Sequence, residues 1–244
     1  MPKTTAYINW SGGKDAALCL YDVLQSCAYD ARYLLTSVNA AHDRVSMHGV
    51  RRSLLVAQAS ALGIGLRTIE LPEQPAMAEY ETAMRQAVSA LKNAGCTHSI
   101  FGDIFLEDLR LYREQQLKAV DVQCVFPLWK QDTAHLVKRS IELGFKSVVV
   151  CVNDKYLDSS FAGRVIDETF LNDLPAGVDP CGENGEFHTF VFDAPYYREP
   201  INIQLGEVVY RTYRAPKQDD DCHTKADPEE AGFYFQDLIL ADKE

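Results

Sequence analysis

The first half of the chain alternates short apolar runs with longer segments of helical periodicity. The apolar runs predict buried strands at residues 6–10, 31–38, 66–71, 98–101 and 123–126. The segments between them have helical spacing and predict helices at residues 16–24, 50–62, 77–94 and 109–120. Strands that alternate with helices in this way predict an α/β fold, with a Rossmann-like parallel sheet and helices on both of its faces.

The pattern is less regular in the second half. It predicts a helix at 132–143 with Asp132 as N-cap, a strand at 147–152, a short helix at 165–171 and an ordered loop at 174–188. Antiparallel strands at 189–192 and 201–213, turning at Gly206, and a helix at 226–240 follow. These elements predict a smaller α+β domain. We therefore expect one domain over 1–127, a second over 128–215, and a peripheral acidic tail over 216–244.

Composition narrows the class of protein. The 244 residues are 47% hydrophobic and carry a formal net charge of −11, so nucleic acid is a disfavoured partner. None of the seven cysteines forms a C-x-x-C pair, which argues against a zinc site, an iron–sulfur cluster and a disulfide framework. No apolar run approaches the length of a membrane span, and a strand begins almost at the first residue. We expect a cytoplasmic protein without membrane contact.

The stretch Ser11-Gly12-Gly13-Lys14-Asp15 joins the first strand to the first helix. Glycines let the backbone approach phosphate oxygens, and the first N–H groups of a helix attract anions. Lys14 adds a positive charge, which we expect to face solvent in a cleft. The spacing excludes both G-x-x-x-x-G-K-[ST] and G-x-G-x-x-G. An anion site is favoured over an ordinary turn with a solvated lysine, and the stretch resembles the pyrophosphate-binding loop of the PP-loop ATPases.

Two further groups of polar residues follow predicted strands, where ligands of parallel sheets bind. Ser37 ends the second strand, and His48 and Arg51 lie one helical turn apart at the start of the second helix, where they are able to hold a phosphate or carboxylate. Gly102-Asp103 ends the fourth strand, and Asp103 is a candidate for magnesium or a nucleotide hydroxyl. The charges from Glu107 to Glu114 are read mostly as an exposed helix face.

The glycine-rich stretch 179–189 is the third group. Glu183, Glu186 and His188 are candidates for binding ammonium, taking a proton from an attacking amine or positioning a carboxylate. Cys181 is a weak candidate nucleophile, since no partner stands at a fixed spacing. A structural turn is the alternative for the whole stretch.

Together these stretches resemble the diphthine–ammonia ligase family of PP-loop ATPases, in the adenine nucleotide alpha-hydrolase-like superfamily. The resemblance covers about residues 5–200, and is carried by residues 11–15, 47–51, 102–114, 157–158, 161, 163–164, 179–189 and 193–195. It implies that ATP adenylates a carboxylate, releasing pyrophosphate, and that ammonia then displaces AMP to form an amide. Free ammonia is the expected donor, because nothing in the chain looks like a glutaminase.

The resemblance also implies roles for individual residues. The ATP and pyrophosphate site comprises Ser11, Gly12, Gly13, Lys14, Asp15, Ser37, His48, Arg51, Gly102 and Asp103. The acceptor site comprises Asp158, Arg164, Glu183, Asn184, Glu186 and His188. The catalytic residues are Lys14, Glu183, Glu186 and His188. The ligands of Mg²⁺ are Asp15 and Asp103.

Two positions depart from the family pattern. In the family, the loop usually continues with Ser, where this chain has Ala16. Members tied to diphthamide synthesis tend to carry the sequence Glu-Gly-Gly-Glu-(Tyr/Phe)-Glu. At the corresponding positions, Glu183–His188, this chain has Glu-Asn-Gly-Glu-Phe-His. This indicates a bacterial subgroup, with diphthine or another carboxylate, such as a corrinoid side chain, as acceptor. A nucleotide-binding regulator without turnover and a tRNA-modifying enzyme are the alternatives. A homo-oligomer is left open.

Overall fold

The computed structural model describes residues 2–241 except 47, 74 and 215–229. A first sheet has six strands in the order β3-β2-β1-β5-β6, with β4 also paired to β2. Its pairings are parallel except that of the two-residue β3, a strand inside the stretch predicted as a polar loop. The strands are β1 Thr4–Asn9, β2 Tyr29–Asn39, β3 Arg44–Val45, β4 Gly65–Leu71, β5 His98–Ile100 and β6 Gln123–Val125.

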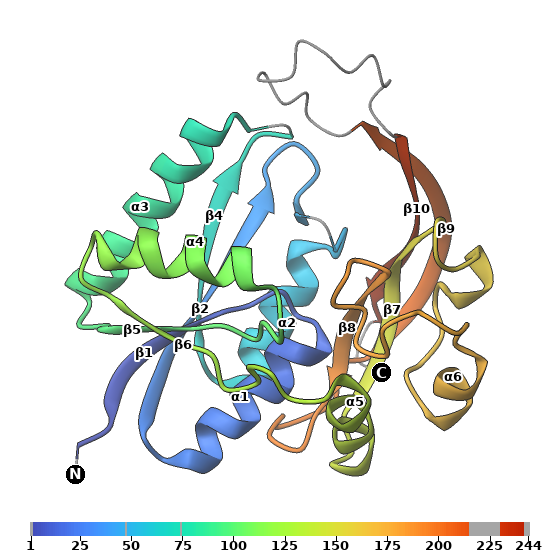
Figure 1. Cartoon of the computed structure of the whole chain (residues 1–244), viewed down its shortest axis with the longest axis horizontal. Helices are drawn as coiled ribbons and strands as arrows, with labels where there is room; N and C mark the ends of the chain where they lie inside the picture. Colours follow the sequence, from blue (N-terminus) through green and yellow to red (C-terminus); the bar gives the residue numbers. More distant parts are fainter. Residues whose placement is uncertain (1, 47, 74, 215–229, 242–244) are drawn as a thin grey trace.

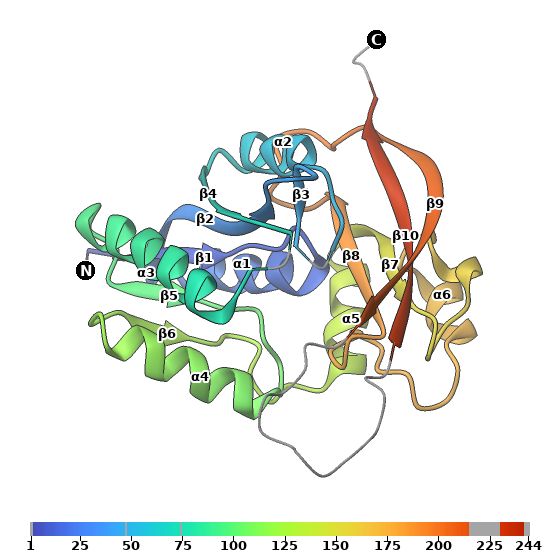
Figure 2. The ribbon, with the colours of Figure 1, turned by 90° about the horizontal axis from the view of Figure 1, so that it is seen from above.

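Helices cover both faces of this sheet, as predicted (Figure 1, Figure 2). They are α1 Lys14–Ser26, α2 Arg52–Leu62, α3 Met77–Asn93 and α4 Glu107–Lys118. Successive residues of β1 point to opposite faces: Ile8 packs into the core with α1 and α2, and Tyr7 packs into a separate core with α3 and α4. The alternating side chains of this buried strand therefore pack against a helix layer on each face of the sheet.

A second, antiparallel sheet stands beside the first, with strand order β8-β7-β10-β9 (Figure 1). Its strands are β7 Lys146–Asn153, β8 Phe187–Asp193, β9 Ile203–Arg214 and β10 Glu230–Leu240. The accompanying helices are α5 Thr133–Glu142, the 3-10 helix η1 Ser159–Phe161 and α6 Glu168–Asp173. Asp132 caps α5 as predicted, because its carboxylate accepts the backbone N–H of His135 at 2.7 Å.

The main hydrophobic core spans both sheets. It contains Ile8 of β1 and Leu18 of α1 together with Phe190 of β8, and β8 packs along α1. The backbone N–H of Val191 donates to the carbonyl of Gly12 at 2.9 Å. The strand that follows the 179–189 stretch is therefore fastened to the glycine loop itself.

Three predictions about the second half are wrong. Residues 230–240 form β10, between β7 and β9, rather than a peripheral helix. Gly206 does not turn the chain: β9 runs through it and bulges where Gly206 and Glu207 face Asp237. The short helix starts three residues late, since Val165 bridges to Val148.

The rest of the predicted acidic tail, with its three consecutive aspartates, lies outside the described residues. Because β10 belongs to the second sheet, the proposed tail does not form a separate part over residues 230–240. The division of the chain after residue 127 stays a prediction.

Candidate active site

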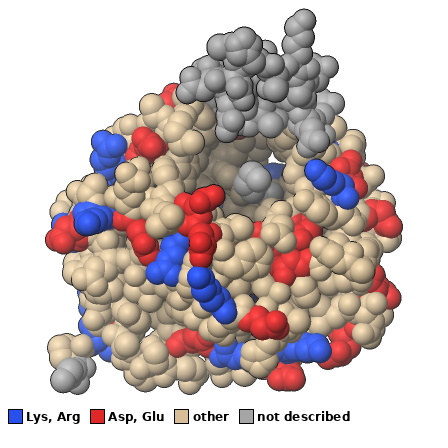
Figure 3. Space-filling view, in the orientation of Figure 1, with Lys and Arg blue, Asp and Glu red and all other residues tan. Residues whose placement is uncertain are grey.

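A cavity of about 450 Å³ lies where the carboxyl ends of β1, β2, β4 and β5 meet the 179–189 stretch. Figure 3 shows the surface hollowed between the two halves of the molecule. The predicted site residues that line this cavity are Ser11, Gly13, Lys14, Asp15, Ser37, His48, Gly102, Asp103, Glu183 and His188. The fold thus brings together most of the polar residues that follow the predicted strands.

The glycine loop has little free space on either side. Gly12 has a φ of +82°, and a Cβ there would lie 2.8 Å from Oε1 of Gln58. The Gln58 amide also donates to the Gly12 carbonyl at 2.9 Å. A Cβ on Gly102 would lie 3.0 Å from the backbone of Asp15, so the loop after β5 also needs glycine to approach α1.

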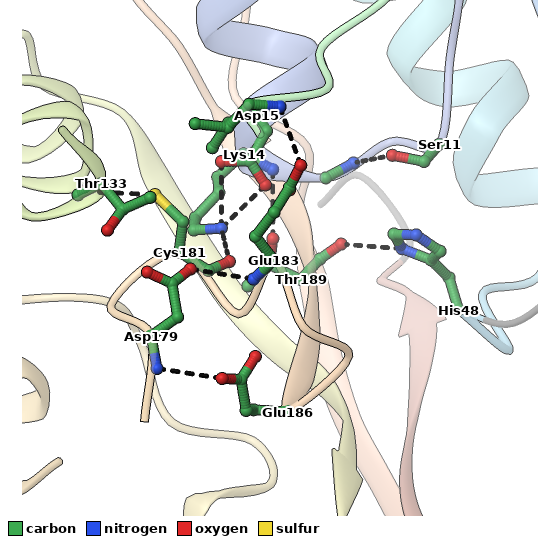
Figure 4. A network of polar contacts seen from close by, with 12 residues as sticks. Ser11, Lys14, Asp15, His48, Thr133, Asp179, Cys181, Glu183, Glu186 and Thr189 are labelled. Carbon is green, nitrogen blue, oxygen red and sulfur yellow. Dashed lines mark hydrogen bonds and ion pairs between the residues drawn. The ribbon is translucent and has the colours of Figure 1, made fainter. Parts of the chain in front are cut away.

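Lys14, the first residue of α1, is buried rather than exposed to solvent. Its ammonium donates to the Asp15 carboxylate at 2.8 Å and to the Cys181 carbonyl, and its backbone N–H donates to Oγ1 of Thr189 at 3.0 Å (Figure 4). Burial lowers the Lys14 pKa, but the surrounding negative charges, led by Asp15, outweigh this effect, so the pKa is raised. Lys14 therefore remains a fixed cation at the start of the helix.

Glu183 is the titratable carboxylate of the 179–189 stretch that lines the cavity. It accepts the backbone N–H of Ile104 at 2.7 Å. Burial raises its pKa to about 7, and the nearby Asp15 and Asp103 add to the shift. A carboxylate with a pKa near neutrality is suited to accept a proton from an attacking amine.

His48 and His188 stack on each other, with ring centroids 4.4 Å apart and an interplanar angle of 29°. Burial lowers the pKa of His188 to about 4 and holds that of His48 well below its ordinary value, and Lys14 adds to both shifts. Both imidazoles are therefore neutral at pH 7. His188 therefore presents an uncharged ring to the cavity.

Asp103 pairs with Arg113 of α4 at 3.1 Å and lines the cavity. Burial raises the Asp103 pKa, and its Oδ2 is buried without a hydrogen-bond partner among the described residues. An unpartnered carboxylate oxygen fits a hard cation such as Mg²⁺, whose other ligands would be phosphate oxygens and water. No group of three metal-ligating side chains occurs in the described part of the chain.

Arg113 was assigned to an exposed face by the sequence pattern, yet it lines the cavity and lies over the Phe101 ring at 4.4 Å. Its spacing of four from Leu109 and Leu117 places it on the buried side of α4, a signal that was present in the sequence. Thr189 and Gln58, which hold the glycine loop, carried no such signal, because their partners are more than 40 residues away.

Five predicted site residues do not line the cavity and have partners outside it. Arg51 pairs with Asp237 of β10 at 2.6 Å, Asp158 caps η1, and Arg164 pairs with Asp173 at 2.7 Å. The other two are Glu186 and Asn184, which are hydrogen-bonded to each other.

Glu186 is buried and organises its own loop. Its carboxylate accepts the backbone N–H groups of Asp179 and Asn184 and the Asn184 side-chain amide, each at 3.0 Å. Cys181 is also structural in character: its buried thiol donates to the Thr133 carbonyl at 3.3 Å, and burial raises its pKa. A protonated thiol is a poor nucleophile.

A parallel sheet, a glycine loop at a helix N-terminus and a buried lysine in its first turn define a nucleotide-binding protein with a PP-loop-like fold. Comparison with known proteins refines this class. Residues 3–123 match the diphthamide synthase N-terminal domain, and residues 132–217 match the diphthamide synthase C-terminal domain. The chain therefore belongs to the diphthamide synthase family.

Individual relatives agree with this membership. The diphthine–ammonia ligase of Danio rerio is 27% identical over 82% of this chain and 86% of its own length. That of Bos taurus is 25% identical over 82% of both chains. The U34-tRNA thiolase NcsA of Methanococcus maripaludis overlaps 58% of this chain and 57% of its own at 14% identity and a TM-score of 0.36, too little to support a functional inference.

In the described part of the chain, no helix is both long and apolar enough to span a bilayer.

Proposed function

We propose that the chain is a diphthine–ammonia ligase-like enzyme that uses ATP to form an amide from a carboxylate and ammonia, releasing AMP and pyrophosphate. The family supports ATP use and amide ligation. The observation that carries the proposal is the convergence in one cavity of a phosphate-suited loop, the buried cation Lys14 and the near-neutral carboxylate Glu183.

In the first half-reaction, an acceptor carboxylate oxygen attacks the α-phosphorus of ATP and pyrophosphate leaves. The N–H groups at the start of α1 and the ammonium of Lys14 stabilise the charge on the departing group. Asp103, with Asp15, would hold Mg²⁺, which supplies further charge neutralisation when bound.

In the second half-reaction, the nitrogen of ammonia attacks the acyl carbon of the mixed anhydride and AMP leaves. The attacking nitrogen must lose a proton, and we assign its acceptance to Glu183, whose pKa of about 7 suits this role. His188 contacts the acceptor as a neutral group. The acceptor is diphthine or another carboxylate whose charge pattern tolerates this uncharged ring.

A direct test follows the phosphate products with ATP, ammonium chloride and candidate carboxylates, including diphthine. We expect AMP and pyrophosphate to appear in equal amounts only when a carboxylate acceptor is present. Formation of ADP and phosphate, or ATP binding without pyrophosphate release with every acceptor, contradicts the proposal. A mobility shift on tRNA tests the disfavoured tRNA-modifying alternative.

A further inference from the structure

A second cavity, of about 380 Å³, lies between helices α3 and α4. Both helices cover the same face of the first sheet (Figure 2). Each helix contributes to the cavity wall a row of residues spaced by four, which are Tyr80, Met84 and Val88 on α3, and Leu109, Arg113 and Leu117 on α4. Residues with this spacing share one face of a helix, so the cavity follows from the way the two helices face each other over the sheet.

The wall of this cavity is mostly apolar. Val88, Phe101 and Leu117 line it and are buried. Arg85 and Ala119 also line it and are exposed, so the cavity reaches from the apolar core to the surface of the helices. Cavities of this volume with apolar walls and a few polar groups are typical of sites for small molecules with an apolar body.

The second cavity adjoins the active-site cavity. The residues that line both are Asn9, Tyr80, Met84, Phe101, Leu109 and Arg113. The guanidinium of Arg113 pairs with Asp103 at 3.1 Å, and Asp103 lines the active-site cavity only. The charged end of Arg113 therefore lies at the boundary between the two cavities.

The charges at this boundary favour an anion. Among the described residues that line the second cavity, two are cations, Arg85 and Arg113, and one is acidic, Glu81. The Nε of Arg113 is buried and has no hydrogen-bond partner among the described residues. A guanidinium carries five N–H donors in a planar fork that matches a carboxylate, so Arg113 is able to hold a carboxylate in addition to its contact with Asp103.

We propose that the cavity between α3 and α4 binds the apolar body of a small carboxylic acid, and that Arg113 holds its carboxylate at the entrance to the active-site cavity. The occupant is the acceptor of the proposed ligase reaction. Its carboxylate then faces the site of adenylation, while its body stays outside the space assigned to ATP. This inference rests on the proposed function and names the class of acceptor, a carboxylate attached to an apolar body.

The test measures binding by isothermal titration calorimetry with the full-length protein and three probes. Phenylbutanoate carries both features, butanoate lacks the apolar ring, and phenylbutanamide lacks the charge. We expect phenylbutanoate to bind at least about tenfold more tightly than either of the others. Arg113→Met should lower the affinity for phenylbutanoate to that for phenylbutanamide and leave the affinity for phenylbutanamide unchanged.

A matched pair of variants locates the binding site. Ala119→Trp places a large side chain at the exposed end of the cavity, and Lys118→Trp places the same side chain at the neighbouring position, which lines neither cavity. We expect Ala119→Trp to raise the Kd of phenylbutanoate about tenfold or more and to leave ATP binding unchanged. Lys118→Trp should alter neither, and far-UV circular dichroism should be the same for both variants.

Failure of this inference is distinguishable from failure of the ligase reaction. Where an acceptor supports pyrophosphate release, phenylbutanoate and Ala119→Trp should each raise the KM of that acceptor without changing the KM of ATP. Pyrophosphate release that neither affects overturns the inference and leaves the proposed function in place. Equal binding of the three probes, or phenylbutanoate binding that both Arg113→Met and Ala119→Trp leave intact, overturns it as well.

Discussion

At the residue scale, Lys14 combines a structural role with the chemical role proposed above. Its ammonium is buried against the Asp15 carboxylate and the Cys181 carbonyl, so its removal leaves both without their partner. The sequence correctly predicted that Lys14 lies between the first strand and the first helix, but it predicted a solvent-facing charge. The buried environment of Lys14 depends on the carbonyl of Cys181, which is 167 residues away in the sequence, and no local pattern reveals that contact.

For Lys14→Met we expect pyrophosphate release to fall about 10²- to 10³-fold, the typical effect of removing one charge-stabilising donor. We also expect a stability loss of about 1–3 kcal/mol, because the buried Cys181 carbonyl and the half-buried Asp15 carboxylate lose their partner. ATP–pyrophosphate exchange measures the first effect and urea unfolding the second. Val56→Ala, at an exposed position of α2, is the control for folding, and normal turnover by Lys14→Met would contradict the loop assignment.

The pKa of Glu183 predicts a pH dependence for amide formation. A base must be deprotonated, so the rate should fall as the pH decreases through about 7 and reach a plateau above it. Rates are compared at constant free ammonia, because ammonia itself titrates. Glu183→Gln should slow amide formation and abolish this inflection while retaining adenylation.

Glu186→Gln separates the two acidic residues of this stretch. Because Glu186 accepts three hydrogen bonds within its own loop, the substitution should lower stability without altering the pH profile. An inflection near pH 7 that persists in Glu183→Gln and disappears in Glu186→Gln would exchange their roles.

At the element scale, the first sheet was predictable because its strands and helices are defined by local periodicity. The β10 segment was not, because Asp227-Pro228-Glu229-Glu230-Ala231 reads like a helix start. The aromatic run that follows, Phe233 to Phe235, favours a strand, but its pairing partners lie in β7 and β9. The strand structure of this segment is therefore determined by its pairing with β7 and β9, which are distant in the sequence.

Asp237 shows how β10 is fastened to the first half of the chain. It pairs with Arg51 at 2.6 Å and Arg44 at 2.9 Å, and its hydrogen bond from Arg51 lowers its pKa. A lowered carboxylate pKa stabilises the fold above the unfolded pKa of about 3.9, and this contribution is lost as the pH falls below it. Asp237→Asn should therefore cost at most about 1 kcal/mol at pH 7 and less at pH 3, measured by urea unfolding. An equal loss at both pH values would mean that the ion pair contributes nothing.

At the scale of the whole molecule, one hydrophobic core joins the two sheets, so the two halves should unfold together. Phe190 of β8 is fully buried and belongs to the same core as Trp10 at the end of β1. Phe190→Ala leaves a cavity and should lower the free energy of unfolding by about 3–5 kcal/mol. Because the core is shared, the substitution should destabilise the elements on both sides of the cavity.

The measurement compares two probes during urea unfolding: tryptophan fluorescence, which reports on Trp10 in the first half and also on Trp129, and far-UV circular dichroism, which reports on both sheets. We expect one transition that shifts to lower urea by the same amount with both probes. Val56→Ala, on an exposed face of α2, should leave the midpoint nearly unchanged. Phe190→Ala could instead shift the circular dichroism transition and leave the fluorescence transition in place. That result would mean that the second sheet unfolds independently of the first. The cavity between the sheets would then open while the nucleotide-binding half stays folded.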